Sequence, residues 1–300
     1  MVKLMDRFKK KRRALEGSLL GTAVGDALGL PWEGMSSRRI RKFGNKIERM
    51  ALFNSKGMIS DDTEHACMVA QALLASSGDP WKFGRSLAWR LRFWLLSLPA
   101  GIGLGTLRSI LKLWMGFPPE KSGVFSAGNG PAMRSPIIGV AYSHDWPRCQ
   151  ELVAKSTRMT HRDPKALVGA FAVALAASFA AEDGLRCQSY FESLEEALVA
   201  REKGFLDLVE KALKSAEKQE EPALFADKMG LGKGVSGYIY HSIPVVLQAA
   251  FQFSQDFRQG LLSLIQCGGD TDTLGAIFGG IVGAQVGKEG IPKEWLDQIW

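Results

Sequence analysis

The sequence is poor in cysteine, and its cysteines lie far apart. Its 300 residues include only four of them: Cys67, Cys149, Cys187 and Cys267. None forms a Cys-x-x-Cys pair, which excludes a zinc knuckle and a dense disulfide framework. Isolated buried thiols are typical of a reducing compartment, so we expect a cytoplasmic protein.

Long apolar runs are also missing. The longest, residues 166–181, is built mainly of Ala. A membrane-spanning helix needs about 20 apolar residues, so we expect a packed interior helix and no membrane partner. No apolar run precedes Leu19, which excludes the pattern of a secretory signal.

Most of the net positive charge lies in one short segment. The formal net charge is +7, and residues 1–13 contribute +6 of it, with seven Lys or Arg residues against Asp6 alone. A basic segment can bind nucleic acid. However, single-stranded nucleic-acid sites interleave aromatic and basic residues, whereas Lys9–Arg13 is an unbroken run beside only Phe8. We therefore expect a solvated, frayed basic N-terminal leader at 1–13, and nucleic-acid binding is the less favoured alternative.

The rest of the chain has a helical pattern. Apolar residues recur at spacings of three and four, and alternating strand-like runs of useful length are missing. The expected helices are 15–28, 63–74, 81–96, 104–115, 149–156, 164–181, 193–203, 205–217, 239–251 and 271–286. No repeat of 30–45 residues suggests a solenoid. The sequence predicts an all-α, compact single-domain multi-helix fold at 14–300, and we expect a monomer.

Several expected helices carry small residues on their inner face. Gly275, Gly279 and Gly283 follow one another at intervals of four in the last long helix. Glycine in a helix costs about 1 kcal/mol relative to alanine, but it lets two helix axes approach closely. This series therefore predicts tight helix packing.

Two acidic clusters stand where helices are expected to begin. The first is Ser60-Asp61-Asp62-Thr63-Glu64, and the second is Asp270-Thr271-Asp272-Thr273, which follows two glycines. Helix capping explains either cluster alone. One cap needs only one oxygen, however, and each cluster offers two carboxylates and at least one hydroxyl.

Four carboxylates gathered in a helical core repel one another unless a cation neutralises them. Donor sets made only of oxygen favour Mg²⁺, Mn²⁺ or Ca²⁺ over zinc. The two clusters together therefore suggest a site for two divalent cations.

Three further features fall on expected turns. A glycine-spaced helix from Gly21 runs into a turn that ends at Glu33, and it lacks the Lys-Ser/Thr of a phosphate-binding P-loop. The segment Gly128-Asn129-Gly130 opens a helix, where backbone amides can hold a phosphate; such a segment alone is more often a plain turn. His161 precedes another helix, and such a histidine is more often structural than functional.

In this order, the motifs resemble the ADP-ribosylglycohydrolase family. The matching segments are Gly21-x-x-x-Gly-Asp-Ala-Leu-Gly29 with Glu33, Ser60–Glu64, Gly128–Gly130 with Ala132-Met-Arg134, Thr160-His161, and Gly268–Gly275. The resemblance covers residues 14–300. It is strongest to the bacterial branch that contains dinitrogenase reductase-activating glycohydrolase.

The resemblance implies an all-α metal-dependent hydrolase with two Mg²⁺ or Mn²⁺ ions in a cleft. Carried over by position, the metal ligands are Ser60, Asp61, Asp62, Asp270, Asp272 and Thr273, with Asp272 as the bridge. Ser60 replaces a frequent Thr and keeps the hydroxyl. Gly128, Asn129 and Gly130 would line the diphosphate and ribose, and His161 would contact ADP-ribose.

One departure from the family concerns the proton acceptor. In the branch named above, an acidic residue proposed for this role lies in the segment that corresponds to residues 99–105. Here no Asp or Glu occurs from Pro80 to Pro119, a stretch with six Lys or Arg residues. Glu33, which matches an acidic residue on a mobile loop of some members, is therefore the best catalytic candidate.

The expected activity is cleavage of the glycosidic bond at C1 of the distal ribose of an ADP-ribosylated protein or small molecule, with release of ADP-ribose. Glu33 would act as general base toward water or as acid toward the leaving group. The alternative is a non-catalytic ADP-ribose-binding module, which the missing acid at 99–105 favours.

Overall fold

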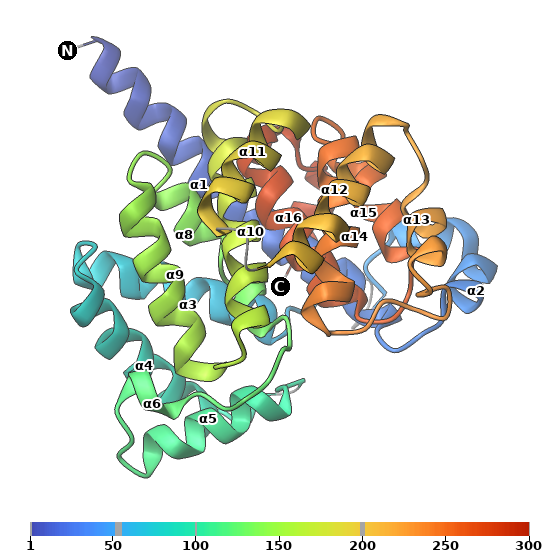
Figure 1. Cartoon of the computed structure of the whole chain (residues 1–300). Coiled ribbons are helices and arrows are strands. Elements are labelled where there is room, and N and C mark those ends of the chain that lie inside the picture. Colours follow the sequence, from blue (N-terminus) through green and yellow to red (C-terminus); the bar gives the residue numbers. More distant parts are fainter. Residues whose placement is uncertain (1, 52–55, 100, 199–201, 300) are drawn as a thin grey trace.

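The computed structural model describes residues 2–51, 56–99, 101–198 and 202–299, and within these ranges it contains helices and isolated bridges but no strand (Figure 1). The longer helices are α1 (Val2–Gly29), α3 (Asp61–Ser76), α4 (Pro80–Leu96), α5 (Leu104–Trp114), α9 (Trp146–Thr160), α10 (Pro164–Glu182), α11 (Cys187–Leu198), α12 (Lys203–Glu217), α14 (Ile239–Gln252), α15 (Phe257–Ile265) and α16 (Thr271–Val286). The all-α prediction is confirmed.

Shorter helical segments connect these. They are α2 (Ser37–Ile40), α6 (Pro119–Ser122), α7 (Gly130–Met133), α8 (Pro136–Ala141), α13 (Pro222–Lys228) and α17 (Lys293–Leu296), with 3-10 turns at Leu30–Trp32, Arg41–Glu48 and Lys288–Gly290. Of the expected helix 193–203, the structure places residues 193–198 at the end of α11, and residues 199–201 lie outside the described ranges. Three single residues also lie outside the described ranges: residue 1 of the expected leader, residue 100 of the 99–105 segment and residue 300 of the expected domain.

Helices α1 and α16 lie side by side and antiparallel, and their backbones touch (Figure 1). Four positions of α1 at intervals of four residues meet four positions of α16, and the pairs are Gly17–Gly283, Gly21–Gly279, Gly25–Gly275 and Gly29–Thr271. A Cβ atom at Gly25 would lie 1.9 Å from the carbonyl oxygen of Gly275. This contact confirms the tight packing predicted from the glycine series. It also brings the end of α1 next to the start of α16.

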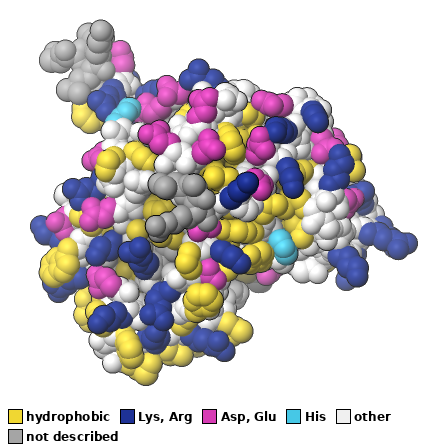
Figure 2. Space-filling view, in the orientation of Figure 1, with side chains coloured by type: hydrophobic (Ala, Val, Ile, Leu, Met, Phe, Trp, Pro, Cys, Tyr) yellow, Lys and Arg dark blue, Asp and Glu magenta, His cyan; other side chains and the backbone are white. Residues whose placement is uncertain are grey.

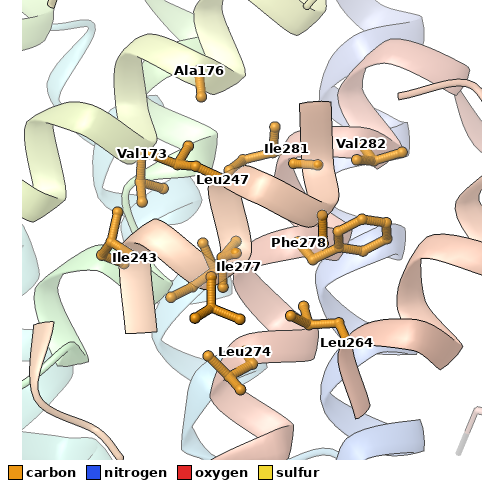
Figure 3. Packing of buried hydrophobic residues seen from close by; sticks show 14 of the residues in the cluster. Val173, Ala176, Ile243, Leu247, Leu264, Leu274, Ile277, Phe278, Ile281 and Val282 are labelled. Atoms are coloured by element: carbon orange, nitrogen blue, oxygen red, sulfur yellow. The ribbon is translucent and has the colours of Figure 1, made fainter. Parts of the chain in front are cut away.

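The predicted interior helix at 166–181 is α10. It is the one helix in the described ranges that is long and apolar enough to cross a membrane, but most of it is buried inside the protein. It packs against α8, α9, α14 and α16. Figure 3 shows Val173 of α10 near Ile243 and Leu247 of α14, with Ile277 and Phe278 of α16 alongside.

The expectation of a frayed leader is wrong, because α1 begins at Val2 and runs without a break through residue 13. Two of its bases bind the ends of other helices. Lys10 Nζ donates to the carbonyl oxygen of Glu182 at 2.6 Å, and Arg13 Nη1 donates to that of Gln285 at 3.1 Å. Cations at helix C-termini satisfy unpaired carbonyls and favour the helix dipole, so these leader bases hold α1 against α10 and α16.

We predict that Gly25→Ala lowers the free energy of unfolding by about 3 kcal/mol, because the new methyl group would overlap the α16 backbone. Gly204→Ala on α12 is the matched control, since a Cβ there meets no atom within 4 Å. The control is expected to raise the free energy of unfolding by about 0.5–1 kcal/mol. Urea unfolding of both variants measures the difference, and equal effects would contradict the backbone contact.

Candidate active site

A cavity of 410 Å³ lies where the N-terminal ends of α3, α5, α7 and α16 meet. Nine of the residues singled out from the sequence line it: Glu33, Asp61, Gly128, Asn129, Gly130, His161, Asp270, Asp272 and Thr273. Backbone N–H groups at helix N-termini carry partial positive charge. The cavity therefore combines a carboxylate cluster with groups that favour an anionic ligand.

The two acidic clusters meet through Asp62, which is buried behind the cavity wall. Its Oδ2 accepts hydrogen bonds from Ser60 Oγ at 3.2 Å and from Thr273 Oγ1 at 3.1 Å. Its Oδ1 is also buried and has no partner among the described residues. A buried carboxylate oxygen without a partner is costly, so Asp62 Oδ1 is available to a cation or a donor.

Three carboxylates form a tight group at the cavity. Glu33, Asp270 and Asp272 each place one oxygen within 4.8 Å of the others. Asp270 and Asp272 come from the start of α16, while Glu33 is exposed and follows the 3-10 turn after α1. Oxygen donors at this spacing can hold a Mg²⁺-like or Mn²⁺-like cation.

Burial and mutual repulsion make these acids hard to ionise. Burial raises the pKa of Asp272 to about 8, with a further contribution from the charges of Asp270 and Glu33. Burial likewise raises the pKa of Asp61 to about 7 and that of Asp62 well above its ordinary value. A bound cation reverses this effect, because opposite charge favours the carboxylate form.

Sequence reasoning missed Asp26, a fully buried acid of α1. Its Oδ2 accepts hydrogen bonds from the backbone N–H groups of Ser60 at 2.9 Å and Thr63 at 3.1 Å, and from the Thr63 hydroxyl. Burial raises its pKa to about 6 against these hydrogen bonds. Asp26 thus fixes the start of α3 on α1. The available signal was that Asp26 is the only acid between Glu16 and Glu33, on a helix that is otherwise apolar there.

The opposite side of the cavity is built of glycines around an imidazole. A Cβ at Gly105 or Gly128 would lie 3.2 Å from His161 Nε2, and one at Gly130 would lie 3.3 Å from Cε1. Larger residues at these three positions would therefore press on the ring. Asn129 connects this side to the acids, because its Nδ2 donates to Asp270 Oδ2 at 2.6 Å.

A chain of hydrogen bonds sets the protonation of His161. Arg134 Nη2 donates to Thr160 Oγ1 at 2.6 Å, and Thr160 Oγ1 lies 2.9 Å from His161 Nδ1. Because arginine only donates, the threonine hydroxyl accepts that bond, and its own hydrogen has two acceptors in reach, Nδ1 at 2.9 Å and the Thr157 carbonyl oxygen at 3.5 Å. The shorter distance favours Nδ1 as the acceptor, and with it a ring proton on Nε2. Burial, and then the charge of Arg134, lower the pKa of His161 to about 3, so the ring is neutral.

Arg134 is itself fully buried, and no carboxylate forms a salt bridge with it in the described ranges. Its Nε donates to Ser156 Oγ and its Nη2 to the Ser156 carbonyl oxygen, both at 2.9 Å. Its Nη1 donates to the Gly130 carbonyl oxygen at 3.2 Å. Five donors in a planar fork suit this set of acceptors, so Arg134 holds the glycine loop and the His161 segment together.

The wall formed by residues 101–105 contains no acid. Gly101, Gly103, Leu104 and Gly105 line the cavity there. The acids that line the cavity are instead Glu33, Asp61, Asp270 and Asp272, which lie at the ends of α1, α3 and α16.

A larger cavity of 610 Å³ lies between α9, α10 and α11 and includes none of the residues expected at the site. Its carboxylate Glu182 already receives hydrogen bonds from Ser143 and Lys10 and lies 2.9 Å from His144 Nε2. The smaller cavity is therefore the candidate site, because it alone of the two gathers the sequence motifs.

We predict that Thr160→Val releases the imidazole of His161 from the Nε2-protonated form, because the valine cannot donate to Nδ1. Thr157→Val is the matched control, since the Thr157 hydroxyl is buried and has no partner among the described residues. Nitrogen NMR of labelled histidine reports the tautomer. A protonated Nδ1 in the unmodified protein would contradict the hydrogen-bond chain.

Comparison with known proteins identifies the family of this chain. The family model for ADP-ribosylglycohydrolase matches residues 8–300. An uncharacterised protein of Archaeoglobus fulgidus is 32% identical over 289 residues, which is 94% of this chain and 90% of that protein. The ADP-ribosyl-[dinitrogen reductase] glycohydrolase of Rhodospirillum rubrum is 28% identical, with 96% of this chain and 90% of that protein covered.

Two further similarities concern a vertebrate enzyme and a solved structure. The ADP-ribosylhydrolase ARH3 of Gallus gallus is 25% identical over 97% of this chain and 90% of that protein. A structure described as an ADP-ribosylglycohydrolase-related protein complex superposes with a TM-score of 0.65 at 26% identity, covering 97% of this chain and 93% of that one. With nearly the whole chain matched, the protein belongs to the ADP-ribosylglycohydrolase family, whose members are hydrolases.

Proposed function

We propose that this protein is a metal-dependent ADP-ribosyl hydrolase that cleaves the glycosidic bond at C1 of the distal ribose and releases ADP-ribose. The observation that carries the proposal is the arrangement of one cavity. Its acidic end has three carboxylate oxygens within 4.8 Å of one another, and its other end has a glycine loop and a neutral histidine. The first end suits a cation and the second suits a diphosphate.

The residues present fit two divalent cations, Mg²⁺ or Mn²⁺. The proposed ligands are Ser60, Asp61, Asp62, Asp270, Asp272 and Thr273. The buried and unpartnered Asp62 Oδ1 supports the assignment, as does the absence of His and Cys from the cavity's acidic end. When bound, such cations orient ribose hydroxyls and lower the pKa of a water molecule.

The substrate's diphosphate would lie against the glycine loop. Gly128, Asn129 and Gly130 stand at the start of α7, and His161 offers its Nε2–H as a neutral donor. A cavity of 410 Å³ is within the usual range for a small-molecule site. Because glycine side chains occupy no space, the backbone of this loop can approach the phosphates closely.

Glu33 would act as the general acid or base of the reaction. It is exposed on the loop that closes the acidic end, and burial together with the charge of Asp270 raises its pKa. A carboxylate with a raised pKa can accept a proton from water or return one to the leaving group. Neighbouring carboxylates would stabilise the positive charge that develops on the ribose in the oxocarbenium-like transition state.

The alternative is a non-catalytic ADP-ribose-binding module. The observation in its favour is the wall at residues 101–105, which has no acid to act as a proton acceptor. Release of free ADP-ribose from a panel of arginine, serine, nucleic-acid and small-molecule adducts, with Mg²⁺ or with chelator, distinguishes the two functions. Binding without release would support the module.

We predict that Asp272→Ala abolishes both Mg²⁺-dependent stabilisation and hydrolysis while the protein stays folded.

Without metal, the free energy of unfolding of the unmodified protein should fall as the pH rises from 5 to 8. The reason is that Asp26 and Asp272 have pKa values of about 6 and about 8 when folded, against about 4 when unfolded. Folding favours their protonated forms, so stability is lost as they ionise. Mg²⁺ should therefore stabilise the protein more at pH 8 than at pH 5.

Thermal unfolding with Mg²⁺ or chelator measures these effects, and Asp207→Ala on the exposed side of α12 is the control. In Asp272→Ala the decline in stability with pH should be shallower. Metal-dependent turnover by Asp272→Ala would remove Asp272 from the metal site.

We predict that Glu33→Gln lowers turnover by about 10²-fold or more, the usual scale for a general acid or base. Its affinity for ADP-ribose should stay the same, because the amide keeps the size of the side chain. Calorimetry and steady-state kinetics give the two values. Unchanged turnover would place the proton acceptor on another residue.

A further inference from the structure

An exposed apolar surface covers α4 and α5. We call it the α4–α5 face, and it consists of Trp89, Phe93, Leu104, Leu111, Trp114 and Met115. Phe93 is 61% exposed and Leu104 and Met115 are each 68% exposed. Phe93 contacts both tryptophans, with ring centroids 5.8 and 6.4 Å apart, so side chains of the two helices form one patch. Contiguous exposed apolar patches on soluble proteins mark interaction sites.

The segment that carries this patch has charge of one sign. Residues 80–119 contain six Lys or Arg residues and no Asp or Glu. Figure 2 shows apolar and basic side chains intermingled over the lower part of the molecule, where Figure 1 places α4, α5 and α6. A partner for this face must therefore combine apolar side chains with negative charge.

The face begins at the mouth of the candidate active site. Leu104 belongs to both, because it is exposed and also lines the cavity beside Gly103 and Gly105. Leu98, which follows the C-terminal end of α4, is 87% exposed and has a φ of 54°. A leucine in the left-handed region is uncommon and costs about 1 kcal/mol or more. The chain thus holds Leu98 outward a few residues before Gly101, the first residue of the segment 101–105 that lines the cavity.

We propose that the α4–α5 face binds the protein part of an ADP-ribosylated substrate, through a segment that has apolar side chains and acidic flanks. This rests on the proposed function, since the ADP-ribosyl group of that substrate would occupy the cavity. The face gives the enzyme a preference for the protein that carries the modification, beyond recognition of ADP-ribose itself.

The contacts of the arginines favour a protein partner over nucleic acid. Arg92 Nε and Nη2 both donate to the Leu113 carbonyl oxygen, at 3.0 and 2.8 Å, and its guanidinium lies over Trp89. Arg90 donates to Gln71 and Ser86. With Arg90 and Arg92 engaged within the protein, the face keeps isolated exposed bases such as Arg108, which can meet an acidic flank but do not form the row of bases that follows a phosphate backbone.

The aliphatic part of the patch points the same way. Leu104, Leu111 and Met115 gain stability by burial against apolar side chains, whereas nucleic-acid sites rely on aromatic stacking with bases. Trp, Phe, Met and Arg are enriched in protein interfaces. A symmetric contact between two copies of this face would place like charges opposite each other, which is unfavourable.

The test uses two synthetic peptides that carry the same ADP-ribosylated residue. One has Leu and Glu around the modified residue, and the other has Ser and Lys in their place. We expect kcat/KM for the Leu/Glu peptide to be at least tenfold higher. Phe93→Ser with Arg108→Glu should remove this preference and leave hydrolysis of the free ADP-ribosyl amino acid unchanged. Leu224→Ser with Lys211→Glu is the matched control, because Leu224 is exposed on α13 and Lys211 on α12.

Binding is measured separately, by fluorescence anisotropy of the unmodified Leu/Glu peptide, so that it does not depend on catalysis. Binding that is lost in the Phe93 and Arg108 variant supports the face even if no ADP-ribosyl compound is hydrolysed, and only the proposed function then fails. The proposal would be overturned if kcat/KM were equal for the two peptides. It would also be overturned if the Phe93 and Arg108 variant lost as much activity on the free ADP-ribosyl amino acid as on the Leu/Glu peptide. Salt-dependent binding of a single-stranded oligonucleotide in place of the peptide, or a change of oligomeric state in the variant, would also overturn it.

Discussion

The contact between the backbones of α1 and α16 is the constraint on which the site depends. Glycines at intervals of four on both helices let the two backbones touch, and a methyl group at Gly25 would overlap a carbonyl oxygen. The contact places the end of α1, with Asp26 and Glu33, beside the start of α16, with Asp270 and Asp272. Two segments more than 200 residues apart in the sequence thereby form one acidic group.

That acidic group works against the stability of the fold, and the surrounding hydrogen bonds limit the cost. Asp26 receives the N–H groups at the start of α3, while Thr273 donates to Asp62 across the two clusters. The raised pKa values of Asp61 and Asp272 show that burial still disfavours their charged forms. A cation would neutralise the charge and give the buried Asp62 Oδ1 a partner, which would link metal binding to folding as well as to the proposed chemistry.

The other end of the cavity follows a different principle, because there a positive charge is buried to orient a neutral group. Arg134 holds Thr160 and the glycine loop, and through Thr160 it favours one tautomer of His161. The wall between the two ends has no acid, and it continues into an exposed apolar and basic face. In the proposed function, cation binding, phosphate binding and substrate selection are therefore divided among different helices.

The sequence alone was sufficient for the helical class, the two acidic clusters, the glycine loop and the family. These depend on local periodicity and on short motifs, which are visible in neighbouring residues. The tertiary structure decided the rest. The role of Asp26, the partners of Arg134, the helical leader and the α4–α5 face all depend on which helices meet, and that follows from long-range packing rather than from local spacing. A buried acid on an apolar helix and an exposed tryptophan look alike in a sequence until the fold shows what lies against them.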